Sequence, residues 1–139
     1  MRTTCAAAIV WIGVLITTVP VAAHHAFAAE FDLDKPVTLT GTVTKLEWTN
    51  PHIWIHLDLK EPNGKVVSWR AEGGAPNALY RIGWKKGSLT VGQEVTVNGY
   101  LARDGSPTAN ANSIKLADGT VFGAASSAPQ KAVGEPSRY

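Results

Sequence analysis

From residue 37 onward, short segments of alternating apolar and polar residues are separated by turns rich in glycine and proline. The alternation is clearest in residues 52–59, where isoleucines and leucines occupy one parity and polar or aromatic side chains occupy the other. A period of two places successive side chains on opposite faces of a strand. The same reasoning predicts further strands at residues 37–44, 65–72, 94–102 and 109–116.

Two local features predict how these strands are arranged. The apolar parity of the first strand switches after Lys45, which predicts a bulge or a bend at Gly41 or Lys45. Pro76 suits the first turn of a helix because it has no amide hydrogen to satisfy, so we expect a short helix over residues 76–84.

The expected order is therefore three strands, a short helix and two further strands. This order predicts an all-β fold, a small OB-like five-stranded Greek-key barrel with one short helix between strands three and four. An open sandwich of similar strand count is the structural alternative. We expect the barrel domain with its N-terminal arm to span residues 24–122. Residues 123–139 show no apolar periodicity, and this composition predicts a disordered tail.

The first 23 residues have the pattern of a secretory signal peptide, with Arg2, an apolar run and small residues up to Ala23. Cleavage there leaves a mature chain that begins at His24 and contains no cysteine, because Cys5 is the single one. We therefore expect a periplasmic or secreted protein with no stable membrane insertion after cleavage. The alternatives are an uncleaved anchor and a later cut after Ala28.

Charge and motifs narrow the classes of function. Loss of Arg2 takes the formal net charge from +2 to +1, so the mature chain is almost neutral. No block of lysine or arginine indicates a nucleic-acid partner. The sequence contains no Gly-x-Ser-x-Gly elbow and no phosphate loop, and nothing fixes its polar residues together as an acid–base group. Whether the chain is an enzyme stays open here, and we favour a non-catalytic protein.

Aromatic and polar side chains on the middle strands supply one candidate site. In OB-folds the face of strands two and three binds oligomeric ligands, and aromatic rings stack on sugars or bases. The alternative is that most of the tryptophans pack inside the barrel or hold the helix against it. The candidate ligand-binding residues are Trp54, His52, His56, Trp69 and Arg70.

The histidines supply a second candidate site. A terminal histidine chelates copper through its amine and its ring, and imidazole and amine suit copper, nickel and zinc. The candidate metal ligands are His24, His25, His52 and His56. His52 and His56 share a strand face but lie roughly 13 Å apart along an extended chain, so each would have to meet a histidine of the N-terminal arm. Alternatively, the strand histidines are half-buried polar residues without a metal.

Several motifs match a known family. The run from His24 to Asp32, the Asn50-Pro51-His52 motif and the Gly-Gly-Ala-Pro-Asn run of residues 73–77 resemble a family of small exported bacterial proteins, catalogued as a domain of unknown function. The resemblance implies an exported single domain that begins at His24, and it implies no activity. We therefore expect an exported periplasmic, non-catalytic binding module for an unknown small ligand or a periplasmic protein. The alternative is a periplasmic copper or zinc binding protein that uses the mature N-terminal histidine.

Overall fold

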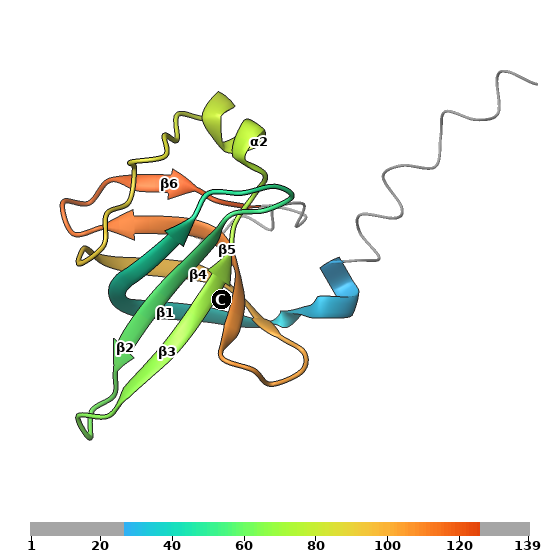
Figure 1. The fold of residues 1–139 in the computed structure, drawn as a ribbon. Coiled ribbons are helices and arrows are strands. Elements are labelled where there is room, and N and C mark those ends of the chain that lie inside the picture. The colour runs from blue at the N-terminus through green and yellow to red at the C-terminus, as the bar shows by residue number, and fades with distance from the viewer. Residues whose placement is uncertain (1–26, 126–139) are drawn as a thin grey trace, which may run out of the picture.

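The structure is a computed structural model that describes residues 27–125 (Figure 1). Residues 27–30 are helical and lead into the first strand. The elements that follow are β1 (Phe31–Glu47), β2 (Trp54–Lys60), β3 (Val66–Glu72), α2 (Pro76–Arg81), β4 (Glu94–Ala102), β5 (Thr108–Leu116) and β6 (Val121–Gly123). The predicted signal peptide, His24, His25 and the chain beyond residue 125 lie outside the described residues.

The strands close into a barrel. Their hydrogen-bonded order is β3-β2-β1-β4-β5-β6, and a further parallel pairing joins β3 to β5. All the other pairs are antiparallel. The β3–β5 pairing closes the first five strands into the barrel, and β6 adds a sixth strand beside β5 that the five-strand prediction lacks. The helix α2 lies between β3 and β4 in the chain (Figure 1). The fold is therefore the predicted all-β OB-like barrel, and the open sandwich is set aside.

The first strand is long because it serves both halves of the barrel. It pairs with β4 through Thr42 and with β2 from Thr42 onward, and its register with β2 shifts between Val43 and Lys45. This irregularity lies where the change of apolar parity predicts a bulge. Gly41 is needed beside it, because a Cβ there would lie 2.7 Å from the carbonyl oxygen of Asp58.

The core is built from the inward faces of the strands. Ile55 and Leu57 have no exposed surface, which confirms the predicted apolar face of β2. Trp84 is 1% exposed, packs against Trp48 and Phe122, and donates its indole N–H to the carbonyl oxygen of Gly123 at 2.7 Å. These tryptophans cover the core beside α2, as the packing alternative for the aromatic residues predicts.

Several boundaries differ from the sequence-based prediction. The strand β1 begins at Phe31 instead of residue 37, and β2 begins at Trp54 instead of residue 52. The helix ends at Arg81 instead of residue 84, because Gly83 adopts a φ of 99°, outside the right-handed helical region. The barrel also extends past residue 122. Gly123 ends β6, and Ala124 is buried and accepts a hydrogen bond from the Gly74 amide at 2.8 Å. Backbone hydrogen bonds hold Ala124 against the barrel. The predicted boundary at residue 122 rests on apolar periodicity, which carries no information about backbone hydrogen bonds.

Within residues 27–125, none of the helices is both long and apolar enough to span a membrane.

Candidate functional site

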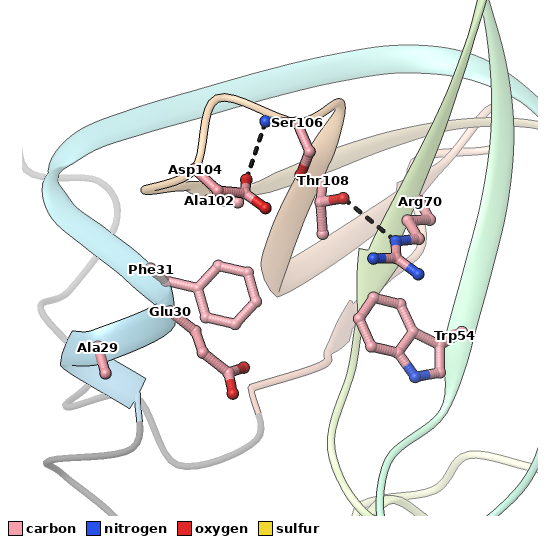
Figure 2. Close-up of a pocket in the computed structure, with 9 residues that line it drawn as sticks. All are labelled: Ala29, Glu30, Phe31, Trp54, Arg70, Ala102, Asp104, Ser106 and Thr108. Carbon is pink, nitrogen blue, oxygen red and sulfur yellow. Dashed lines mark hydrogen bonds between the residues drawn. The ribbon is translucent and has the colours of Figure 1, made fainter.

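A pocket of about 290 Å³ opens on the outer face of β2 and β3 (Figure 2). Three parts of the chain form it: the N-terminal segment, the two strands, and the loop between β4 and β5. Its lining residues are Ala29, Glu30, Phe31, Trp54, Arg70, Ala102, Asp104, Ser106 and Thr108. In OB-folds this strand face and the β4–β5 loop are the usual ligand-binding surfaces, so the pocket is the candidate site.

Arg70 is held in place by two neighbours. It is paired with His56 across the β2–β3 ladder, so Trp54 is its diagonal neighbour on the same face. The guanidinium carbon lies 4.8 Å from the centre of the Trp54 ring. On the other side, Arg70 Nε donates to Thr108 Oγ1 at 3.2 Å, a contact that the parallel β3–β5 pairing provides. The terminal guanidinium nitrogens form no ion pair within residues 27–125.

Asp104 faces Arg70 from the β4–β5 loop (Figure 2). Its Oδ1 accepts a hydrogen bond from the Ser106 amide at 2.9 Å. Hydrogen bonds from Ser106, the hydroxyl first and then the amide, hold the pKa of Asp104 below its ordinary value, and the charge of Arg70 lowers it further. The carboxylate is therefore ionised at neutral pH while the turn fixes its position.

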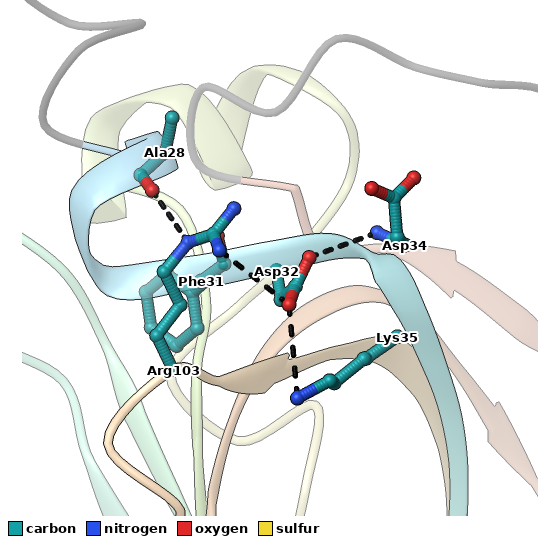
Figure 3. Close-up of polar contacts among 6 residues, drawn as sticks. All are labelled: Ala28, Phe31, Asp32, Asp34, Lys35 and Arg103. Atoms are coloured by element: carbon teal, nitrogen blue, oxygen red, sulfur yellow. Dashed lines mark hydrogen bonds and ion pairs between the residues drawn. The ribbon is translucent and has the colours of Figure 1, made fainter.

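The N-terminal segment is fastened against the same loop (Figure 3). Arg103 Nε donates to the carbonyl oxygens of Ala28 at 2.7 Å and Phe31 at 3.1 Å, and its Nη1 lies 3.5 Å from Asp32. Beneath it, Phe27 and Phe31 pack together with a ring separation of 5.4 Å. This arrangement makes residues 29–31 a fixed wall of the pocket.

The predicted ligand-binding residues fall into two groups. Trp54 and Arg70 line the pocket. His52, His56 and Trp69 do not line it. Trp69 is paired with Leu57 across the β2–β3 ladder, so it lies on the inward face and packs against the core.

His52, which precedes β2, and His56, which lies on it, each contact a different carboxylate. His52 Nδ1 contacts the buried Glu72, and His56 Nε2 lies 3.0 Å from Glu47 Oε1. Hydrogen bonding to Lys45, the largest cause, and to His56 lowers the pKa of Glu47. In the described part of the chain, no three His, Cys, Asp or Glu residues are grouped to hold a metal ion. Metal binding through His24 and His25 stays a prediction, because both lie outside this part.

Sequence reasoning missed the wall and loop residues of the pocket. In the sequence, Asp104 and Ser106 belong to a run with glycine and proline that predicts only a turn. Glu30 and Phe31 are not part of any known binding motif. Thr108 sits at the start of β5, beside Arg70, only because the barrel closes there. The one usable signal was the expected fold itself, since the β4–β5 loop of an OB-fold borders its ligand face.

A second hollow of about 230 Å³ lies over β1 and β4. It is lined by Pro36, Val37, Thr38, Asn98, Gly99 and Tyr100, with no Asp, Glu, Lys, Arg or His among them. The first pocket holds a cation and two carboxylates, so it offers more specific recognition.

Fold and pocket together define a small OB-like barrel with a charged cleft beside strands two and three. The chain belongs to a family of unknown function, DUF6152, whose model matches residues 12–111. Among solved structures it is similar to the dimeric N-terminal domain of PriB protein from Thermoanaerobacter tencongensis. The two share 20% sequence identity with a TM-score of 0.40, over 60% of this chain and 96% of that domain. No curated protein matches the chain.

Proposed function

We propose that the chain is an exported, non-catalytic binding module that holds a small ligand with an anionic group in the pocket on β2 and β3. The observation that carries this proposal is Arg70. Its guanidinium is positioned by Trp54 and Thr108, yet it has no carboxylate partner within residues 27–125.

A positioned guanidinium suits an anion for physical reasons. Its planar fork of donors matches the two oxygens of a carboxylate or the oxygens of a phosphate. The contacts to Trp54 and Thr108 restrict the side chain before binding, so less conformational entropy is lost when an anion arrives. Because Arg70 covers one face of the Trp54 ring, Trp54 positions the arginine and is a poorer platform for stacking a sugar or a base.

Export rests on the amino-terminal sequence. Arg2, the apolar run and the small residues up to Ala23 form the pattern of a signal peptide.

The experiment is a titration of the secreted protein with 4-methylpentanoate, a small carboxylate with an apolar tail, followed by NMR. We expect saturable shifts at the Trp54 indole N–H and at the Ser106 amide. Arg70→Gln should abolish the shifts. Arg81→Gln is the matched control, because Arg81 is exposed at the end of α2 and does not line the pocket. Equal shifts in wild type and Arg70→Gln would refute the proposal.

A further inference from the structure

We infer that the ligand is a zwitterion of about amino-acid size, with its carboxylate on Arg70 and its ammonium group on the carboxylates of Asp104 and Glu30. This inference rests on the proposed function, because it takes Arg70 as the group that binds the anion. It adds a cationic group of the ligand on the side of the pocket that faces Arg70.

The first argument is that opposite charges face the same pocket without forming a direct ion pair. Some cations of the domain contact carboxylates directly, as in the pair of Arg103 with Asp32 at 3.5 Å and the pair of Lys45 with Glu47 at 2.6 Å. Arg70 and Asp104 form no such pair. Arg70 contacts Trp54 and Thr108, and Asp104 accepts a hydrogen bond from Ser106. A ligand between the guanidinium and the carboxylate can therefore contact both groups.

The second argument concerns Glu30. Its backbone carbonyl accepts a hydrogen bond from the Arg103 amide at 2.9 Å, which anchors the residue to the β4–β5 loop. Its side chain extends past Phe31 toward Trp54 (Figure 2). Among the described residues the Glu30 carboxylate has no hydrogen-bond partner or ion pair. The pocket therefore holds two carboxylates with unused acceptors and one guanidinium with unused donors.

Charge balance separates a zwitterion from simpler ligands. A plain anion at Arg70 would also meet the repulsion of Asp104 and Glu30, and a plain cation would meet the repulsion of Arg70. A molecule that carries both charges avoids both penalties. The lowered pKa of Asp104 agrees with this reading, because the carboxylate stays charged where an ammonium group would bind.

The size and the apolar wall limit the remainder of the ligand. A volume of about 290 Å³ lies near the lower end of small-molecule pockets, which run from roughly 300 to 1,000 Å³. Phe31, Ala29 and Ala102 supply apolar surface. A free amino acid with an aliphatic side chain fits this description better than an oligosaccharide does.

The test compares three probes of nearly equal size on the secreted protein by calorimetry: leucine, 4-methylpentanoate without the amine, and leucine amide without the carboxylate. We expect leucine to bind at least about tenfold more tightly than either of the others, as expected for loss of one charge-assisted contact. Asp104→Asn should weaken leucine binding by a similar factor without weakening that of 4-methylpentanoate. Glu30→Gln should act in the same direction.

The matched control is Asp118→Asn. Asp118 lies in the turn before β6, and its Oδ1 accepts the Thr120 amide at 2.8 Å, just as Asp104 accepts Ser106. Asp118 is not in the pocket, so its variant should bind leucine normally. Equal affinity for leucine and 4-methylpentanoate, with both dependent on Arg70, would overturn the zwitterion and leave the proposed function intact. Binding of all three probes that is indifferent to Arg70→Gln, or no binding, would overturn both.

Discussion

Gly99 lies where β4 passes β5 too closely for any side chain. It is fully within the ladder, paired with Ala111 next to a register shift between Asn98 and Gly99. A Cβ on Gly99 would overlap the carbonyl oxygen of Asn110 and lie 2.9 Å from its carbonyl carbon. Because these are backbone atoms, no rotamer change relieves the overlap. Gly99→Ala therefore requires the two strands to separate locally by more than about 1 Å.

The cost follows from what the separation disturbs. Overpacking a well-packed site costs about 1–3 kcal/mol, and weakening one or two ladder hydrogen bonds adds about 0.5–1.5 kcal/mol each. We expect a loss of about 2–4 kcal/mol, a large share of the roughly 5–15 kcal/mol that stabilises a domain. For a domain of this size that corresponds to a drop in Tm of roughly 10–25 °C.

Thermal unfolding followed by circular dichroism measures the change, and the chain offers a matched control. Gly87 lies in a turn without a positive φ, and a Cβ at this position would have no heavy atom within 4 Å. Gly87→Ala should shift the free energy of unfolding by less than about 1 kcal/mol in either direction. If Gly99→Ala melts within a few degrees of Gly87→Ala, the close approach of β4 to β5 is wrong, and with it the placement of the β4–β5 loop at the pocket.

Ile55→Asp should unfold the domain, because it buries an unpaired charge at a site with no exposed surface. His56→Ala should change the free energy of unfolding by less than about 1 kcal/mol. Similar losses of Tm in the two variants would mean that β2 faces the other way. The pKa of Asp118 is lowered in the folded state, by hydrogen bonds from the amide and then the hydroxyl of Thr120. Its stabilising contribution is therefore complete above the ordinary value of 3.8 and is lost as the pH falls through the lowered pKa, so Asp118→Asn should flatten the acid limb of a urea-denaturation series. Sequencing of the secreted protein should give His24 as the first residue, and a start elsewhere would contradict the predicted signal cleavage. Copper(II) should bind this terminus more tightly than zinc, and an extra residue before His24 should weaken the binding measured by calorimetry; equal binding by both forms would refute the terminal chelate.

Most of the strands follow from local pattern alone. The alternation of residues 52–59 predicts β2 and its buried face, because a period of two is a property of neighbouring residues in an extended chain. The parity change near Lys45 predicts the bulge for the same reason. The alternation also places Trp54 on the outward face, so Trp54 and Arg70, two of the nine residues that line the pocket, could be predicted from the sequence.

The rest of the candidate site depends on segments that are distant in the chain. Thr108 meets Arg70 only through the parallel β3–β5 pairing that closes the barrel. Glu30 reaches the pocket only because Arg103 fastens residues 28–31 to the β4–β5 loop. The sequence by itself determined which residues form strands and which face of each strand is apolar, because hydrophobic periodicity is local. Only the tertiary structure decided which charges share a pocket, because that depends on barrel closure between segments that no local period relates.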